Sequence, residues 1–584
     1  MKTRTTATSK LATEASEHAT NHPSAHDPSA RESARATTNA SANASANAAA
    51  TATATSKASN TAPSRTTPIW LATATVPHFP ALEGDERADV CVIGAGIAGL
   101  STAYMLLRAG KTVVVIDAVG VGDGETGRST AHFFPPDERY FEIENSFGTE
   151  NAKLVADAYR KATDCVGVII RSERIACEFE RLDGFLISPD QQWDDTLEHE
   201  YAVTTRLGVN VRRHERVPGL AFDTGPCLRF ANQAQFHPLK YLDGLARAIV
   251  RMGGRIYDNT RALDIRGDSK LQTVQTEAGA IQAASVVVAT NTPFNERVVM
   301  HTRQAGYRTY VLAMRVPKDA LPRMLLWDTG APYHYVRLAC GPAGASYELL
   351  VVGGQDHKTG QADDAEQRYQ RIEAWVRARF PLAGDVDCRW SGEIMEPADG
   401  VAFLGRNPLD HDNVYIISGD SGNGMTHCTV GAILVSDLIA GRRSDWSALY
   451  DPARKAVHGI GEFITAQANT LLQYTDWLRG GDVETVDEIG AGEGAVLRDG
   501  GKLLAVYRSE DGVLQAVSAA CTHLGCAVHW NSDDKSWDCP CHGSRFGADG
   551  AVLHGPARRP LPAATLTGAD ASPTGDGKAA ERRT

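Results

Sequence analysis

The stretch that decides the fold is DVCVIGAGIAGLSTAYMLLRAGKTVVVID, residues 89–117. Its apolar start, 89–93, predicts a short buried strand. The glycines that follow have the spacing Gly-x-Gly-x-x-Gly and open a predicted helix over about 97–109, before a second predicted strand over 112–116. A strand, a glycine turn, a helix and a second strand in this order are typical of a dinucleotide-binding unit, in which the helix N-terminus faces the pyrophosphate.

Each position in this unit has a physical task. Gly94 allows the tight turn, Gly96 lets the pyrophosphate approach the backbone, and Gly99 lets the helix pack closely on the strand. Asp117 follows Gly99 by 18 residues, a spacing typical of an acid that binds the ribose hydroxyls, which favours FAD or NAD over NADP. The predicted cofactor-binding residues of this unit are Gly94, Gly96, Ile97, Ala98, Gly99 and Asp117.

Composition excludes several classes of protein. The 584 residues include 59 Lys and Arg against 71 Asp and Glu, a net charge of −12 that disfavours nucleic-acid binding. No stretch approaches the roughly 20 apolar residues of a spanning helix. The 11 cysteines are too few for a disulfide-dense secreted scaffold, but four of them crowd between 521 and 541.

Changes in composition along the chain predict several separate segments. Of residues 1–60, 38 are Ala, Ser or Thr, so the N-terminal segment cannot bury enough apolar surface to fold, and it has no apolar centre of a signal peptide. Without an export signal, we expect the protein in the cytoplasm. The predicted division is a disordered tail over 1–66, an oxidoreductase part over 67–454, a helical connector over 455–482, a small all-β domain over 483–567 and a disordered tail over 568–584.

Beyond Asp117, the chain resembles the D-amino-acid oxidase/glycine oxidase family. The resemblance rests on collinear segments over 124–132, 237–242, 253–256, 260–265, 286–291, 390–392, 397–400 and 419–425. It implies FAD as the cofactor, bound by an α/β Rossmann-like domain that is interleaved with an antiparallel (α+β) substrate domain. The further FAD-binding residues that it implies are Arg128, Ser129, Thr130, Ala131, His132, Ala262, Ala289, Gly422, Asn423, Gly424 and Met425.

Some residues of this part allow two interpretations. In the related dimethylglycine and sarcosine dehydrogenases a His in a Gly-Ser-Thr-Trp-His context bonds covalently to flavin, whereas Arg128 and Ala131 replace two of those residues here. We therefore expect His132 to pack beside the cofactor. Tyr333, Tyr335 and Arg337 are candidates for substrate binding, in which Arg337 would bind a substrate carboxylate with two hydrogen bonds. The alternative is that all three are ordinary residues of a strand whose polar side chains point outward. His357 and His427 are further candidates for substrate binding, but we expect both to be structural histidines.

The second motif is CTHLGC at 521–526 with CPCHGS at 539–544. A Cys-x-His pair and a Cys-x-x-His pair are typical of a Rieske [2Fe-2S] centre, in which Cys521 and Cys539 would bind one iron and His523 and His542 the other. A zinc site is the alternative, since Cys and His also suit tetrahedral zinc, but the full pattern favours the cluster.

The resemblance to the Rieske proteins of cytochrome bc complexes has two further implications. It implies a disulfide between Cys526 and Cys541 that ties the two loops together. Phe546 stands where the high-potential members carry a Tyr that hydrogen-bonds a cluster ligand, so we expect a lower reduction potential here.

Together the motifs predict a flavin dehydrogenase that oxidises a small amine or amino acid at a C–N bond. Its electrons would pass singly to the cluster and then to an external acceptor. The alternative is an electron-transfer or reductase component fed by an external donor, against which the absence of a second, nicotinamide-binding Rossmann motif counts. A ring-hydroxylating oxygenase would need a mononuclear iron site, and no Asp/Glu-x-x-His-x₄-His pattern supplies one. No catalytic base is identified.

Overall fold

The computed structural model describes residues 67–136, 139–295, 300–455, 469, 473–478 and 480–567. The predicted tails over 1–66 and 568–584 and most of the predicted connector lie outside these residues. Within the described part, no helix is both long enough and apolar enough to cross a bilayer.

The described helices and strands alternate along the chain. The α-helices are α1 (Ile69–Thr73), α2 (Ile97–Arg108), α3 (Tyr140–Phe147), α4 (Thr149–Glu173), α5 (Asp195–Leu207), α6 (Pro238–Arg251), α7 (Ala365–Arg379), α8 (Gly424–Ile439) and α9 (Ser447–Tyr450). The 3₁₀ helices are η1 (Glu125–Gly127), η2 (Tyr474–Leu478) and η3 (Val486–Glu488). The strands before the C-terminal part of the chain are β1 (Glu86–Ile93), β2 (Val113–Ile116), β3 (His132–Phe133), β4 (Glu180–Ile187), β5 (Val211–His214), β6 (Cys227–Gln235), β7 (Arg255–Tyr257), β8 (Asp264–Gly267), β9 (Gln272–Gln275), β10 (Ala280–Val288), β11 (Gln304–Pro317), β12 (Leu325–Asp328), β13 (His334–Cys340), β14 (Tyr347–Lys358), β15 (Val386–Pro397), β16 (Phe403–Arg406) and β17 (Val414–Ser418). The C-terminal strands are β18 (Glu493–Asp499), β19 (Lys502–Arg508), β20 (Leu514–Ser518), β21 (His529–Asn531), β22 (Ser536–Asp538), β23 (Arg545–Gly547) and β24 (Val552–His554).

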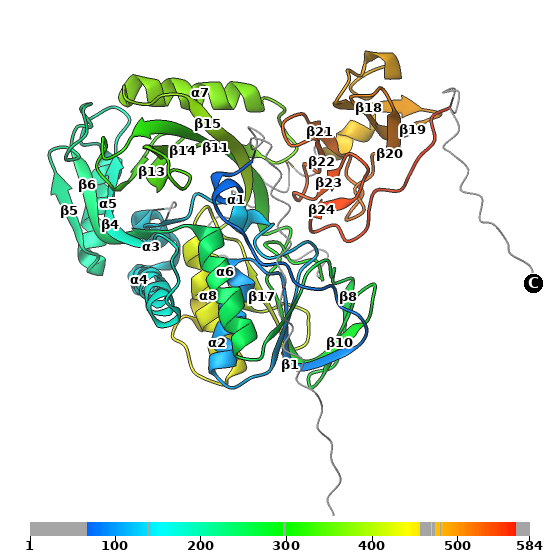
Figure 1. Ribbon diagram of the computed structural model, residues 1–584, viewed down its shortest axis with the longest axis horizontal. Helices are drawn as coiled ribbons and strands as arrows, with labels where there is room; N and C mark the ends of the chain where they lie inside the picture. The colour runs from blue at the N-terminus through cyan, green and yellow to red at the C-terminus, as the bar shows by residue number, and fades with distance from the viewer. Residues whose placement is uncertain are drawn as a thin grey trace, which may run out of the picture. The chain divides into compact units, whose positions relative to one another are not determined.

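The first sheet is the predicted dinucleotide-binding sheet. Its strands run in the order β16-β17-β10-β1-β2-β7, and β17, β10, β1, β2 and β7 are parallel. The ends of β1 and β2 are buried apolar runs, as expected for parallel strands covered on both faces. Helices α2, α6 and α8 lie side by side against this sheet (Figure 1).

The second sheet is interleaved with the first in chain order, as predicted. Its strands run β15-β11-β14-β13-β12-β4-β6-β3, with β5 beside β6. Pairing is antiparallel except between β12 and β4, which run parallel. The sheet is therefore mixed and not purely antiparallel: the chain leaves it after β6, adds β7 to β10 to the first sheet, and returns with β11 before β12 pairs with β4. Helix α7 lies along one face of β11 and β14 (Figure 1).

The C-terminal part is all-β, as predicted. It contains a sheet β18-β19-β20 and a sheet β21-β22-β23-β24, both antiparallel. Its core holds Trp537 and Phe546, which are fully buried, together with the four clustered cysteines.

Candidate functional site

Only glycine fits at two positions after β1, one in the turn before α2 and one in the first turn of α2. Gly94 has φ +108°, and a Cβ there would lie 2.4 Å from the Ala289 carbonyl oxygen. A Cβ on Gly99 would lie 1.8 Å from the Gly94 carbonyl oxygen. The glycine spacing in the sequence therefore reflects close approach of α2, the turn and the end of β10.

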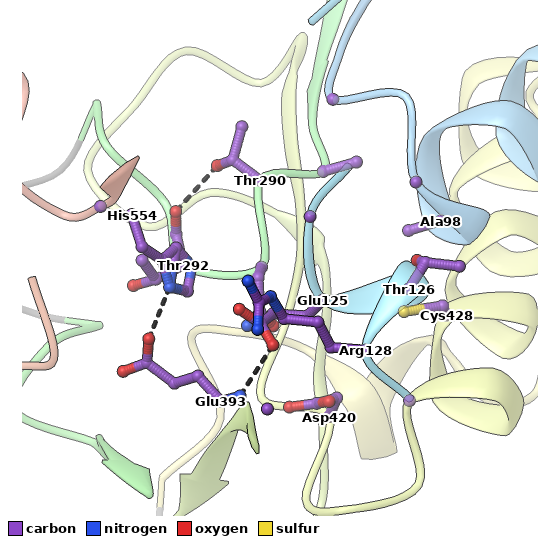
Figure 2. Close-up of a pocket in the computed structure, with 18 of the residues that line it drawn as sticks. Ala98, Glu125, Thr126, Arg128, Thr290, Thr292, Glu393, Asp420, Cys428 and His554 are labelled. Atoms are coloured by element: carbon purple, nitrogen blue, oxygen red, sulfur yellow. Dashed lines mark hydrogen bonds and ion pairs between the residues drawn. The ribbon is translucent and has the colours of Figure 1, made fainter. Parts of the chain in front are cut away.

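A cavity of about 450 Å³ opens at this turn (Figure 2). Most of the predicted FAD residues line it: Gly94, Gly96, Ile97, Ala98, Asp117, Arg128, Ser129, Thr130, Ala262, Ala289, Gly422, Gly424 and Met425. The predicted residues that are not among its lining are Gly99, Ala131, His132 and Asn423. The Asp117 carboxylate accepts hydrogen bonds from the backbone N–H of Ala95 at 2.7 Å and Val119 at 2.9 Å, which fixes it at the end of β2.

His132 is buried behind the cavity wall. Its Nδ1 lies 3.0 Å from the Thr130 hydroxyl and its Nε2 lies 3.5 Å from the Val336 carbonyl oxygen. Burial, with a smaller contribution from the Arg337 charge, lowers the pKa of His132 to about 3. The imidazole is therefore neutral and engaged in the protein interior, as expected for a packed histidine.

Arg337 holds the loop and does not face the cavity. One of its terminal nitrogens donates to the carbonyl oxygens of Thr130 and Ala131, each at 2.9 Å, and to that of Phe236 at 3.1 Å. These bonds fix the carbonyls of the predicted flavin loop. The suggested grip of Arg337 on a substrate carboxylate is therefore wrong, because this buried guanidinium is committed to the backbone.

The two candidate histidines have structural surroundings. His427 lines the cavity, but its Nδ1 lies 2.8 Å from the Asp420 carbonyl oxygen and its Nε2 lies 3.0 Å from the Tyr159 hydroxyl. His357 stacks on Tyr310 with ring centroids 5.7 Å apart. Burial lowers the pKa of both histidines to about 4.

A group of buried carboxyls near the cavity was not foreseen. Burial raises the pKa of Asp356 to about 6 and the pKa values of Glu396 and Asp420 to about 7. Asp356 accepts a hydrogen bond from the Tyr333 hydroxyl at 3.0 Å, and Tyr333 lines the cavity. These acids come from β14, β15 and the loop after β17, so no local sequence pattern joins them.

The second motif forms two facing loops. The thiols of Cys521 and Cys539 interact directly, and the ring centroids of His523 and His542 lie 5.0 Å apart. The Nδ1 atom of His542 is buried and makes no hydrogen bond to the described residues. Two thiols and two imidazoles that converge in this way, one of them with an unused buried nitrogen, fit a [2Fe-2S] Rieske cluster.

The loop termini are tied together as predicted. Cys526 and Cys541 form a disulfide with a Cα–Cα distance of 6.5 Å. The backbone N–H of Cys521 donates to the Cys526 carbonyl oxygen at 2.9 Å, and that of Cys539 donates to the Ser544 carbonyl oxygen at 2.8 Å. Each cysteine–histidine pair is thus held by its own tight turn.

The C-terminal part forms a wall of the cavity at the predicted flavin site. The residues that it supplies to the lining are Asp534, Arg545, Val552, Leu553, His554, Gly555, Ala557 and Arg558. His554 Nδ1 lies 2.6 Å from a carboxylate oxygen of Glu393, which is on β15 (Figure 2). Burial alone lowers the pKa of His554, but the Glu393 charge outweighs it and the pKa is raised.

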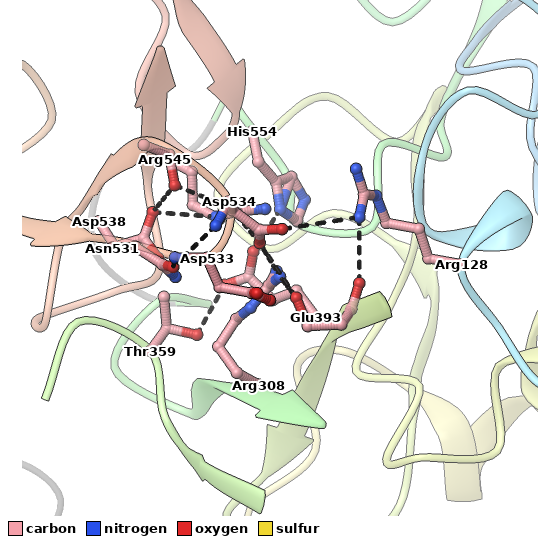
Figure 3. A network of polar contacts seen from close by, with 12 residues as sticks. Arg128, Arg308, Thr359, Glu393, Asn531, Asp533, Asp534, Asp538, Arg545 and His554 are labelled. Carbon is pink, nitrogen blue, oxygen red and sulfur yellow. Dashed lines mark hydrogen bonds and ion pairs between the residues drawn. The ribbon is translucent and has the colours of Figure 1, made fainter. Parts of the chain in front are cut away.

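A buried charge network joins the same two parts (Figure 3). Asp534 pairs with Arg308, whose side chain is fully buried on β11, and with Arg545 at 2.7 Å. Arg128 lies 4.0 Å from Asp534. Sequence reasoning missed this network because Arg128 and Arg308 lie hundreds of residues before Asp534 and Arg545, and each is an ordinary charged residue in its local context.

Glycines let the cluster loops approach the oxidoreductase part. A Cβ on Gly306 would lie 3.3 Å from the Gly543 Cα, and a Cβ on Gly360 would lie 2.8 Å from the Pro540 backbone nitrogen. The loop that carries Cys539 and His542 therefore packs directly on β11 and on the turn after β14.

Comparison with known proteins agrees with this geometry. The family model described as FAD dependent oxidoreductase matches residues 89–438. This chain belongs to that family. A second model, described as Rieske [2Fe-2S] domain, matches residues 480–565. The protein is thus an FAD-dependent oxidoreductase with a Rieske [2Fe-2S] domain, and its cofactors are FAD and the cluster.

Individual relatives cover one or both parts. The chain is 32% identical over 496 residues to "Putative Rieske 2Fe-2S iron-sulfur protein YhfW" of Bacillus subtilis (strain 168), a match that covers 84% of this chain and 96% of that protein. It is 28% identical to gamma-glutamylputrescine oxidoreductase of Escherichia coli (strain K12), over 62% of this chain and 86% of that enzyme. The crystal structure of glycine oxidase from Geobacillus kaustophilus superposes with a TM-score of 0.51 at 17% identity, over 63% of this chain and 99% of that one, and shows the same fold.

Proposed function

We propose that this FAD-dependent oxidoreductase is a dehydrogenase that oxidises a small amine or amino acid at a C–N bond. Electrons then pass one at a time to its own Rieske cluster, and from there to an external acceptor. The observation that carries the proposal is the shared cavity: residues of the oxidoreductase part and of the Rieske domain line the same space. A fixed, short separation replaces the encounter of two diffusing proteins.

In this proposal the cavity residues have separate tasks. Gly94, Gly96 and the first turn of α2 hold the pyrophosphate with backbone N–H groups, and Asp117 accepts from the ribose. The loop fixed by Arg337 and the stretch Gly422–Met425 would hold the flavin ring. When bound, FAD accepts two electrons from the substrate as a hydride, whereas the cluster takes them singly.

The buried acids favour an amine as the substrate. Asp356, Glu396 and Asp420 concentrate carboxyl groups beside the cavity. A substrate ammonium or amine group compensates buried carboxyl groups. Tyr333 and Tyr335 also line this region, and a relative is named as an oxidoreductase of gamma-glutamylputrescine.

An anaerobic substrate screen tests the proposal. Purified holoprotein is mixed with small amines, N-methylated amines and amino acids, and the flavin absorbance and the cluster EPR signal are followed together. We expect an amine to bleach the flavin and then to produce the EPR signal of the reduced cluster. Flavin reduction with a cluster that stays oxidised contradicts the internal route, and reduction by NAD(P)H but by no amine assigns the protein to the reductase class.

A variant tests the substrate class. Asp356→Asn is expected to raise the KM for a cationic amine at least tenfold, because it removes the negative charge of a buried carboxyl group, and to leave light-driven flavin reduction unchanged. Asp511→Asn, an exposed acid of the Rieske domain, is the control for the change in net charge. An unchanged KM in Asp356→Asn contradicts this assignment of the amine site.

A further inference from the structure

We propose that His301 is the residue through which electrons pass between the flavin cavity and the Rieske cluster. The inference rests on the proposed function, since it concerns the route of the internal transfer. It assigns to His301 a positioning role: its ring fills the space between the cavity wall and the two cluster histidines.

One side of His301 contacts the cluster loops. Its ring centroid lies 4.7 Å from that of His523, at an interplanar angle of 81°, and 6.2 Å from that of His542, at 68°. His301 belongs to the oxidoreductase part, just before β11, and is 2% exposed. A buried aromatic ring from one domain thus packs edge-on against both imidazoles of the other.

The other side of His301 reaches the cavity. Its Nδ1 lies 3.5 Å from the hydroxyl of Thr292, a buried residue that lines the cavity. Gln304 donates to the same hydroxyl at 3.4 Å and to the Ser418 hydroxyl at 3.0 Å, which fixes Thr292. Thr292 and His301 therefore form a continuous packed path from the cavity to the cluster loops.

Physical reasoning favours this path over the nearby alternative. Electronic coupling for tunnelling decays steeply across gaps and less steeply through bonded or tightly packed atoms, so a route with few gaps dominates. His554 also lines the cavity, but its side chain pairs with Glu393, whereas His301 packs on both cluster histidines. In each transfer one electron leaves the reduced flavin and reduces one ferric ion of the cluster to ferrous. The His301 ring itself is neither oxidised nor reduced.

The test needs no substrate. The flavin of the full-length holoprotein is reduced by a light flash with a sacrificial donor, and the appearance of the reduced cluster is timed by its absorbance and by freeze-quench EPR. The variants are His301→Ala, which leaves a gap, and His301→Leu, which fills the site without a ring. His554→Gln probes the alternative route, and His411→Ala changes an exposed histidine of the β16–β17 loop as the matched control. Midpoint potentials of both cofactors are measured in every variant.

We expect transfer to slow at least tenfold in His301→Ala and at least threefold in His301→Leu, with both midpoint potentials unchanged. His411→Ala should keep the wild-type rate, and a slowing in His554→Gln that exceeds the slowing in His301→Ala overturns the proposal. A rate within threefold of wild type in an assembled His301→Ala protein overturns the proposal. If that variant binds no cluster, a wild-type rate in His301→Leu overturns it. A wild-type protein in which reduced flavin never reduces the cluster refutes the proposed function itself, which is a distinguishable result.

Discussion

Asp534→Asn is expected to weaken the attachment of the Rieske domain to the oxidoreductase part. The substitution keeps the shape of the side chain and removes its charge. Asp534 is 11% exposed, and its partners Arg308 and Arg545 are 0% and 6% exposed. Two Arg308 guanidinium nitrogens already lack hydrogen-bond partners among the described residues, so this arginine depends on Asp534 for compensation of its charge.

The magnitude follows from the burial of these charges. Removing one partner of a buried ion pair costs about 3–5 kcal/mol, because the remaining charge stays uncompensated. Arg545 keeps a second partner, Asp538, at 3.0 Å, whereas Arg308 forms no other ion pair with a carboxylate of the described residues. We therefore expect Asp534→Asn to lower the free energy of unfolding by about 3 kcal/mol, the lower end of that range.

The assay is urea unfolding of the holoprotein, with flavin and cluster absorbance recorded separately. Both transitions should shift to lower urea, and flavin-to-cluster transfer should slow as the domains separate. Asp511→Asn is the control, since it removes the same charge from an exposed site of the Rieske domain. An Asp534→Asn protein that unfolds within about 0.5 kcal/mol of this control, the range of ordinary surface substitutions, would refute the reasoning.

The same carboxylate predicts acid sensitivity. Burial by itself raises the pKa of Asp534. The positive charges of Arg308, Arg545 and Arg128 lower it by more than burial raises it, so the pKa in the folded protein is below the ordinary value of 3.8. A depressed pKa stabilises the fold above the unfolded-state pKa, and this stabilisation is lost as the pH falls through the folded-state value. In the unfolded chain this carboxyl group has the ordinary pKa of an aspartate, about 4. As the pH falls below about 4, wild type should therefore lose stability more steeply than Asp534→Asn.

Three further predictions concern separate parts of the chain. Gly99→Ala should reduce the flavin content of the purified protein at least tenfold, because its Cβ would lie 1.8 Å from a backbone oxygen, while Gly480→Ala, with nothing within 4 Å, should retain flavin. Glu200→Gln should remove a loss of stability at high pH: burial raises the pKa of Glu200 to about 7, so the wild type is stabilised at low pH and loses this as the pH rises through 7. Chemical denaturation gives the free energy of unfolding at pH 5 and at pH 8. Its decrease between the two pH values should be about 2 kcal/mol larger in wild type than in Glu200→Gln, and an equal decrease in both proteins would contradict the prediction. Cys526→Ala removes the disulfide to Cys541, which closes a loop with a sequence separation of 15 residues, and should lower the free energy of unfolding of the Rieske domain by about 3 kcal/mol. The measurement is the denaturant concentration at which the cluster absorbance is lost, which should be lower in the variant. Chemical reduction of the disulfide in wild type should have the same effect.

Local sequence was sufficient wherever a site is built from neighbouring residues. The glycine turn follows from the residues 94–99, since close backbone approach leaves glycine as the only fit. The cluster loops follow in the same way, because each supplies one thiol and one imidazole from a single turn and the disulfide joins the two. Interleaving of the two sheets could be predicted only through the resemblance to a family, since strand order depends on contacts between distant segments.

The sequence by itself therefore determined the two cofactor-binding units and their order along the chain. Only the tertiary structure decided how these units meet. Arg337 lies on a strand as expected, yet its neighbours across the fold are backbone carbonyls and not a substrate. Asp534, Arg308 and His301 carry no local signal, because a charged residue or a histidine becomes significant only when folding buries it against a partner from another element. Burial and long-range proximity are properties of the folded chain, and they are what bring the flavin cavity and the cluster loops together.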